Sequence, residues 1–284
     1  MSKIKIVECP RDAMQGIHEF IPTATKAAYI NTLLKVGFDT IDFGSFVSPK
    51  AIPQLKDTAE VLAQLDLSET SSNLLAIVAN QRGAEDAANF EEIQYLGYPF
   101  SISETFQQRN TNSSIEQSLG RVEAIQELCV KHNKELVTYI SMGFGNPYGD
   151  LFHEDIVASW INRLRELDLK IFALSDTIGV SEPKIISRLF SVLIKEYPSL
   201  EIGAHLHTTP DTWKEKVDAA YKNGCRRFDG AILGFGGCPM AADDLTGNMA
   251  TENLVDYSKE EKVDLGLQTD LFKKARFEAN KVFL

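Results

Sequence analysis

Residues 201–207, EIGAHLH, decide how the rest of the chain is organised. This apolar run lies between Pro198 and Pro210, which is typical of a buried strand. Alternate side chains of a strand point to the same face, so we expect His205 and His207 to project together at its carboxyl end. Two imidazoles placed in this way can clamp a metal ion. A single histidine on an apolar face would more often be an ordinary core residue.

Strand-like runs and helical patterns alternate on both sides of this stretch. The expected strands cover residues 4–8, 40–46, 74–80, 92–101, 135–142, 170–174, 201–207 and 227–233. The expected helices cover residues 25–36, 58–65, 83–89, 115–132, 154–166, 183–196, 213–223 and 250–259, and a further helix covers 270–282. Eight repeats without a linker predict one (β/α)8 TIM barrel over residues 1–284, with a C-terminal helix, about 268–284, packed outside. A doubly wound open sheet is the alternative.

The composition limits the possible partners. A formal charge of −11 and a pI near 5.0 argue against nucleic acid, because phosphate contacts need a basic surface. No apolar run approaches the length of about 18 residues that a membrane span needs, and the first residues do not resemble a targeting segment. We therefore expect a cytoplasmic protein without nucleic-acid or membrane partners. The four cysteines are scattered, which indicates reduced thiols.

Polar residues gather where the expected strands end. In a TIM barrel the loops after the strands build the active face, so these side chains should converge. The candidates are Arg11, Asp12, Gln15, Asp42, Ser45, Asn80, Asp176, His205, His207, Asn248 and Glu252. Asp176 is expected to orient a ligand or support another site residue, or else only to end its strand. Asn248 is a candidate ligand or a helix N-cap.

Asp12 and Arg11 complement the two histidines chemically. Asp12 can supply the carboxylate oxygen that a metal site needs, and the Arg11 guanidinium can stabilise an oxyanion. Imidazole, carboxylate and amide ligands together suit Mg²⁺ or Mn²⁺, and the ligand types are also compatible with Zn²⁺.

The segment 234–239, GFGGCP, is the second chemical signal. Its glycines permit backbone conformations and close approaches that a side chain would block. Cys238 is the reactive group that this loop presents, and we interpret it as an acid–base thiol on a lid. A tight turn with a bystander cysteine is the alternative.

Five motifs in order along nearly the whole chain resemble the 3-hydroxy-3-methylglutaryl-CoA (HMG-CoA) lyases of the DRE-TIM metallolyase superfamily. They are PRDAMQ (10–15), SFVSPK (45–50), the H-x-H of 205–207, GFGGCP (234–239) and GNMATE (247–252). The resemblance implies a (β/α)8 barrel that uses Mg²⁺ or Mn²⁺ to cleave (S)-HMG-CoA to acetyl-CoA and acetoacetate. It also implies that the protein binds an acyl-CoA and could form a homodimer.

The resemblance also assigns roles to individual residues. It implies Asp12, His205, His207 and Asn248 as metal ligands and Arg11 as the residue that stabilises enolate charge. It implies Cys238 as the thiol that assists proton transfer, Gln15 and Asp42 as active-site residues, and Glu252 as a support for Asn248. Asp12 and His205 are both candidates for the general base. Ser45, Asn80 and Asp176 are expected at the substrate, and Lys50 and Arg109 are candidates for the CoA phosphates.

The sequence also departs from the lyase pattern. Asp42 stands where the lyases usually have Glu, Thr208 replaces an Asp, Ala13 replaces a Gly and Asn146 replaces a Cys. These differences leave open a related 3-hydroxyacyl-CoA as substrate. An acyl-CoA-dependent Claisen synthase is a second alternative, although its H-x-H is usually followed by Asn-Asp. A barrel that binds a CoA ester without catalysis is a third.

Overall fold

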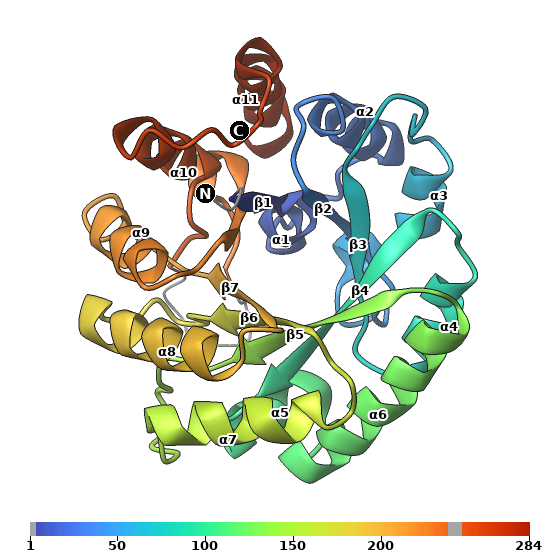
Figure 1. Cartoon of the computed structure of the whole chain (residues 1–284). Coiled ribbons are helices and arrows are strands. Elements are labelled where there is room, and N and C mark those ends of the chain that lie inside the picture. Colours follow the sequence, from blue (N-terminus) through green and yellow to red (C-terminus); the bar gives the residue numbers. More distant parts are fainter. Residues whose placement is uncertain (1–3, 238–245) are drawn as a thin grey trace.

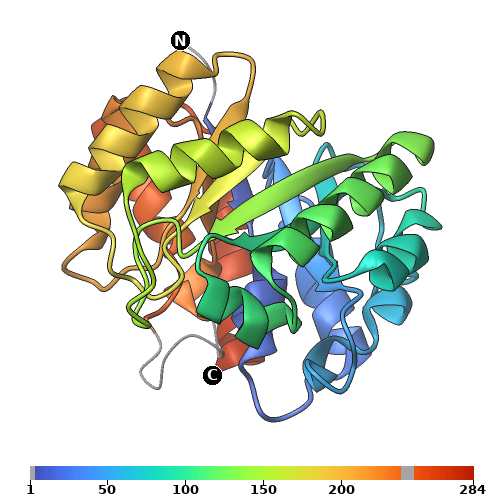
Figure 2. The same ribbon diagram turned by 90° about the horizontal axis from the view of Figure 1, so that it is seen from below.

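The computed structural model describes residues 4–237 and 246–284 of the chain. Eight strands in this part of the chain form one closed barrel in sequence order, and every neighbouring pair is parallel. Figure 1 shows the helices as a ring around these strands, and Figure 2 gives the view turned by 90°. The predicted (β/α)8 barrel is confirmed, and the doubly wound alternative is wrong.

The strands are short and mostly buried, as expected for a parallel sheet covered by helices. They are β1 (Lys5–Glu8), β2 (Thr40–Ser45), β3 (Asn73–Ile77), β4 (Ile93–Ser101), β5 (Glu135–Ser141), β6 (Ile171–Ser175), β7 (Glu201–His205) and β8 (Arg227–Gly230). β7 ends two residues before the predicted end because His207 pairs with Asn248 in an antiparallel bridge. β8 ends before the predicted Leu233, which turns the chain with a φ of 68°.

The helices follow the strands around the barrel. They are α1 (Pro10–Gln15), α2 (Thr23–Leu33), α3 (Thr58–Leu62), α4 (Gln81–Ala88), α5 (Glu104–Thr111), α6 (Ile115–Lys131), α7 (Glu154–Arg165), α8 (Pro183–Glu196), α9 (Trp213–Lys222), α10 (Thr251–Glu260) and α11 (Thr269–Phe283). Two 3₁₀ turns, η1 (Pro53–Leu55) and η2 (Ile232–Gly234), complete the described elements. Local signals fix several helix starts, such as the capping box of Ser114 and Gln117 at α6.

Two helices have no counterpart in the sequence prediction. α1 follows β1 directly, and Pro10 occupies its first turn, where a backbone N–H is not needed. α5 begins after Ser103, whose hydroxyl accepts from the Phe106 N–H at 3.1 Å. Both are short, and α5 is mostly polar, so neither shows the apolar period that predicts a helix.

The C-terminal helix α11 packs on the outside of the barrel beside α2. Phe283 contacts Tyr29 edge to face, with ring centroids 5.6 Å apart, and it stacks on Phe235 at 5.2 Å. Phe235 lies in the glycine-rich segment after β8, so α11 also packs against that segment. None of the helices in residues 4–237 and 246–284 is long and apolar enough to cross a membrane.

The barrel interior has two chemically different sides. Leu75, Val137 and Ala173 form a small apolar cluster with Tyr139, on β3, β5 and β6. On β1, β7 and β8 the strands carry a chain of ion pairs instead, which joins Lys5, Glu201, Arg227 and Asp229. This chain leads to His205 and therefore connects the barrel interior to the candidate site.

Candidate active site

A cavity of about 630 Å³ opens where the strands end. Its lining combines polar side chains from α1 and the end of β7, including Arg11, Asp12 and His205, with apolar groups such as Phe106. This is the face on which TIM barrels carry their active sites. Six of the polar residues predicted at the strand ends line this one cavity: Arg11, Asp12, Gln15, Asn80, His205 and His207.

Three potential metal ligands meet in this cavity. Asp12, His205 and His207 each offer one ligand atom, and these atoms lie within 4.8 Å of one another. The two imidazole rings have centroids 5.4 Å apart, and His205 Nε2 lies 4.0 Å from Asp12 Oδ2. Asp12 comes from α1, His205 ends β7 and His207 follows two residues later. The side chains from these three positions point toward one another.

Asn248 is the fourth predicted ligand, and it lies beside Asp12. Its amide nitrogen donates to Asp12 Oδ2 at 2.7 Å and to the Phe235 carbonyl at 2.9 Å. The segment that carries it is fixed by backbone hydrogen bonds from the Thr208 N–H to the Gly247 carbonyl and from the Met249 N–H to the Leu206 carbonyl. The chain after β8 is thus held against the chain after β7, and this brings Asn248 to the histidines.

The protonation states of these groups suit a metal ion. Burial, together with the neighbouring His205, lowers the pKa of His207 to about 4, so its ring is neutral at pH 7. Burial acts to raise the pKa of Asp12, but Arg11 and the histidines outweigh it and lower that pKa. His207 Nδ1 is buried and accepts no hydrogen bond within the described part of the chain. Two imidazoles and a carboxylate whose ligand atoms lie within 4.8 Å of one another are a donor set that fits a divalent cation.

Arg11 is held rigidly next to these ligands. Its Nη2 lies 2.5 Å from Asp42 Oδ2, its Nε is 3.0 Å from the same oxygen, and its Nη1 donates to Asp12 Oδ1 and Gln15 Oε1 at 2.9 Å. Desolvation acts to lower the pKa of Arg11, but Asp42 and Asp12 raise it, so the guanidinium stays charged. Burial raises the pKa of Asp42 to about 6 although Arg11 opposes this shift. The result is a fixed positive charge at the cavity wall.

A model of the HMGL-like family matches residues 3–277, nearly the whole chain. The chain belongs to the HMGL-like family. Hydroxymethylglutaryl-CoA lyase YngG of Bacillus subtilis is 34% identical over 254 residues, which cover 89% of this chain and 84% of that protein. A 3-hydroxy-3-isohexenylglutaryl-CoA/hydroxymethylglutaryl-CoA lyase of Pseudomonas aeruginosa is also 34% identical, over 256 residues with the same coverage.

Solved structures of HMG-CoA lyases share the fold of this HMGL-like chain. A lyase of A. baumannii in complex with coenzyme A and 3-methylmalate superimposes with a TM-score of 0.91 at 29% sequence identity, covering 99% of this chain and 91% of that one. Enzymes of the HMGL-like family depend on a divalent metal, and the Asp12, His205 and His207 cluster is where this chain could hold one.

Of the other predicted site residues of this HMGL-like protein, some line the cavity and others lie outside its lining. Gln15 and Asn80 line the cavity. The Asn80 side chain also caps α4 by accepting from the Gly83 N–H at 2.9 Å. Ser45 lies outside the lining of this cavity, and its hydroxyl donates to the Ile77 carbonyl at 3.2 Å.

Asp176 lies behind His207 rather than in the cavity wall. Its carboxylate accepts from the Ser181 hydroxyl at 2.5 Å and from Lys216 Nζ at 2.8 Å. Lys216 also donates to the His207 carbonyl at 3.0 Å. Asp176 therefore fixes, through Lys216, the backbone that carries a predicted ligand.

The described part of the glycine-rich loop, up to Gly237, packs against the ligands. Gly236 has a φ of +104°, and a Cβ built on it would lie 2.4 Å from Asn248 Nδ2 and 2.9 Å from the Asp12 carbonyl. Glu252 accepts from the Leu233 N–H at 3.1 Å and from Arg276 Nε at 2.8 Å, so it anchors the start of this loop. Cys238, the predicted thiol, lies outside the described residues.

Two buried carboxylates of this HMGL-like chain, Asp229 and Glu8, had no role assigned from the sequence. Asp229 on β8 lies 3.1 Å from His205 Nδ1. Burial acts to lower the pKa of His205, but Asp229 outweighs it and raises that pKa. Glu8 on β1 accepts from the Ile232 N–H at 2.8 Å and from the Thr251 hydroxyl at 2.6 Å. The available signal was a carboxylate inside a strand expected to be buried, because such a group needs a buried partner.

Proposed function

We propose that this protein is a divalent-metal-dependent carbon–carbon lyase that cleaves (S)-HMG-CoA to acetyl-CoA and acetoacetate. One observation supports this most strongly: Asp12, His205 and His207 converge within 4.8 Å next to a fixed Arg11, in a chain of the HMGL-like family. Mg²⁺ or Mn²⁺ is the proposed metal, with Asn248 as its fourth protein ligand.

The reaction makes three demands on the site. The tertiary hydroxyl of the substrate must lose its proton, the carbon–carbon bond must break, and the thioester enolate that leaves must be stabilised and then protonated. A divalent ion held by Asp12, His205, His207 and Asn248 would polarise substrate oxygens as a Lewis acid. The remaining demands are met by side chains of the protein.

Arg11 is proposed to stabilise the developing enolate. Its guanidinium lines the cavity and is held by Asp42, Asp12 and Gln15, so no reorganisation is needed when charge appears on the thioester oxygen. Asp12 accepts the hydroxyl proton in this proposal, because His205, the other predicted base, is committed to the metal through Nε2.

The other predicted residues have supporting roles in the proposal. Gln15 and Asn80 contact the substrate directly because they line the cavity, and Asp42 acts through Arg11. Ser45 and Asp176 hold neighbouring backbone, and Glu252 holds the loop beside Asn248. Arg109 and Arg121 line the same cavity and are the proposed contacts for the CoA phosphates.

Cys238 is proposed to protonate the enolate from the glycine-rich loop. Substitution of Cys238 by Ser should leave folding and metal binding intact and slow turnover, because a hydroxyl is a much weaker acid than a thiol. Turnover and metal content of the purified variant measure this. Full activity of the variant would show that Cys238 takes no part in proton transfer.

A related 3-hydroxyacyl-CoA is the second candidate substrate. The P. aeruginosa relative is named for both isohexenylglutaryl-CoA and HMG-CoA, and Phe106, Ile77 and Pro99 give this cavity an apolar wall. A comparison of kcat/KM for HMG-CoA with that for a longer acyl analogue separates the two.

The proposed setting of the reaction is the cytoplasm.

Acetoacetate release from HMG-CoA by the purified protein tests the function. We expect release with Mg²⁺ or Mn²⁺, loss with EDTA and recovery when metal is restored. His207→Asn should be inactive, whereas His153→Asn should remain active because it changes a half-exposed helix cap that is not part of the cavity lining. Absence of acetoacetate from the metal-loaded protein would contradict the proposal. Formation of free CoA from acetyl-CoA and a 2-oxo acid would favour the Claisen synthase instead.

A further inference from the structure

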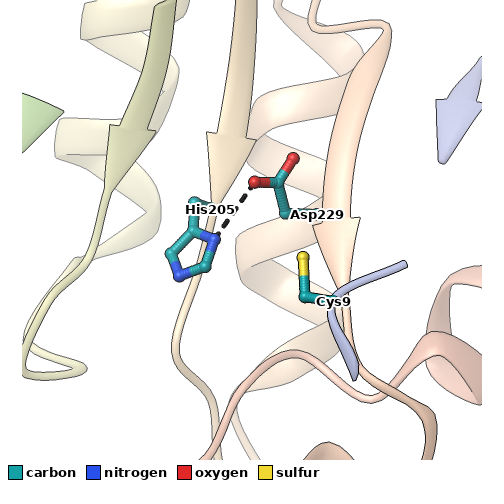
Figure 3. A group of neighbouring side chains, drawn as sticks. All are labelled: Cys9, His205 and Asp229. Carbon is teal, nitrogen blue, oxygen red and sulfur yellow. Dashed lines mark hydrogen bonds and ion pairs between the residues drawn. The ribbon is translucent and has the colours of Figure 1, made fainter. Parts of the chain in front are cut away.

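Asp229 is a buried carboxylate directly beside a proposed metal ligand. It is register-paired with His205 across β7 and β8, and its side chain is 1% exposed. Asp229 Oδ2 lies 3.1 Å from His205 Nδ1, and Figure 3 shows the carboxylate approaching the ring from the side away from Nε2. No step of the proposed reaction uses this carboxylate.

A chain of ion pairs fixes Asp229 from behind. Its other oxygen, Oδ1, accepts from Arg227 Nη1 at 3.1 Å, and Arg227 Nε lies 3.3 Å from Glu201 Oε1. Glu201 in turn pairs with Lys5 at 2.5 Å. The four charges alternate in sign, so the carboxylate is neutralised and both of its oxygens are committed. Asp229 therefore cannot turn away from His205 without leaving a buried Arg227 charge unpaired.

This arrangement selects one tautomer of His205. A carboxylate only accepts hydrogen bonds, so the neutral ring must carry its proton on Nδ1 and donate it to Asp229. The lone pair then resides on Nε2, the nitrogen that faces Asp12. A histidine that coordinates a metal through Nε2 requires this tautomer, and a fixed carboxylate partner also raises its basicity.

Cys9 completes the group drawn in Figure 3 but does not form a competing metal site. Ligand atoms of Cys9, His205 and Asp229 lie within 4.8 Å of one another. Both Asp229 oxygens are already occupied, however, and the thiol donates to the Val7 carbonyl at 3.6 Å. Cys9 is 1% exposed and serves as an apolar wall that shields the pair from water.

We propose that Asp229, held by Arg227, is a positioning residue that fixes the Nδ1–H tautomer of His205 and so prepares Nε2 for the metal. The inference rests on the proposed metal site of the lyase. Asp229 touches neither substrate nor metal in this proposal and acts through His205 alone.

Substitution of Asp229 by Asn gives the sharpest test. Arg227 only donates, so it should hold the amide oxygen and turn the amide N–H₂ toward His205. His205 Nδ1 must then accept, and the ring proton moves to Nε2, where it blocks coordination. We expect Mn²⁺ to bind about 10–100-fold more weakly by calorimetry. Asp57→Asn is the matched control, because it also removes a buried carboxylate, paired with Lys26 at 2.7 Å, but leaves the ligands untouched.

The tautomer can be measured without metal or substrate. In metal-free, ¹⁵N-histidine-labelled protein at pH 9, we expect the Nδ1–H form of His205 in the wild type and in Asp57→Asn, and the Nε2–H form in Asp229→Asn. A His205→Asn sample assigns the resonances. The wild-type spectrum tests the inference even if Asp229→Asn does not fold. If His205 carries its proton on Nε2 in the wild-type protein, the inference is overturned.

A double-mutant comparison separates positioning from a structural role. In a His205→Asn background, Asp229→Asn should no longer change Mn²⁺ affinity, because the group it acts through is absent. An equal loss in both backgrounds, or wild-type affinity in the single variant, would overturn the proposal. HMG-CoA cleavage is scored separately, so a failure of the proposed function leaves these readouts valid.

Discussion

Buried charges in this site are all engaged by opposite charges or hydrogen-bond donors. Arg11 lies between Asp42 and Asp12, and Glu8 accepts two hydrogen bonds. Removing one partner of a buried pair leaves the other desolvated, so such residues are sensitive to substitution. This makes it possible to separate a catalytic charge from a structural one by comparing turnover with metal binding.

Arg11→Met should lower kcat by roughly 10²–10³-fold, since one well-placed charge contributes about 3–4 kcal/mol to an oxyanion. Metal content should change little, because Arg11 is not among the proposed ligands. Steady-state kinetics and metal analysis of the same preparation measure both quantities. Arg163→Met, which removes an exposed arginine paired with Glu116, is the control and should keep wild-type turnover. Near-normal turnover of Arg11→Met would remove this residue from the mechanism.

Glu8 should make the free energy of unfolding depend on pH. Burial raises its pKa in the folded protein to about 8, from an ordinary value near 4.5. Between these values the folded state holds one proton more than the unfolded state, so this contribution to stability is full below about pH 4.5 and is lost as the pH rises to about 8.

Glu8→Gln mimics the protonated side chain and should remove that dependence. Urea denaturation of both proteins between pH 5 and 9 should show the wild type losing stability relative to the variant as the pH increases. A constant difference across this range would mean that Glu8 is ionised throughout.

Single residues could be predicted where a motif places them at a strand end. Asp12, His205, His207 and Asn248 meet as expected. Asp229 could not be predicted in the same way, because its partner depends on the register of β7 against β8, which brings it opposite His205. The spacing of residues along the chain does not reveal how these two strands align.

At the scale of elements, apolar periodicity predicted the long helices and the strands. α6 and α8 begin at their predicted residues because capping and Pro signals coincide with the apolar pattern. α1 and α5 are too short for that pattern, and the ends of β7 and β8 depend on contacts with the segment around Asn248. Tertiary contacts decided these boundaries.

The glycine-rich loop after β8 should not tolerate a side chain at Gly236. Gly236→Ala would place a methyl group 2.4 Å from Asn248 Nδ2 in a backbone conformation that favours glycine. We expect Mn²⁺ affinity and turnover to fall by at least tenfold, as measured by calorimetry and the acetoacetate assay.

Gly120→Ala is the matched control for this prediction. A Cβ at Gly120 in α6 would meet nothing within 4 Å, so the variant should keep full activity and gain up to about 1 kcal/mol of stability. If Gly236→Ala behaved like Gly120→Ala, the close packing of the loop would have no part in holding Asn248.

At the scale of the whole molecule, barrel closure brings distant parts of the chain to one site. β1 pairs with β8, which places α1 and its Asp12 beside the segment of Asn248, 236 residues away in sequence. The repeat of strands and helices predicted this closure. It did not predict that one side of the barrel interior would be ionic, because side-chain pairing across strands follows from register.

The location of the bound metal tests the central claim most directly. Crystals of the protein grown with Mn²⁺ can be measured for anomalous scattering at the manganese edge. The account predicts one strong peak within coordination distance of Asp12, His205, His207 and Asn248, with Asp229 behind His205 and not in contact with the ion. A peak bound by Cys9 and Asp229 instead, or no peak in the cavity at saturating Mn²⁺, would contradict it.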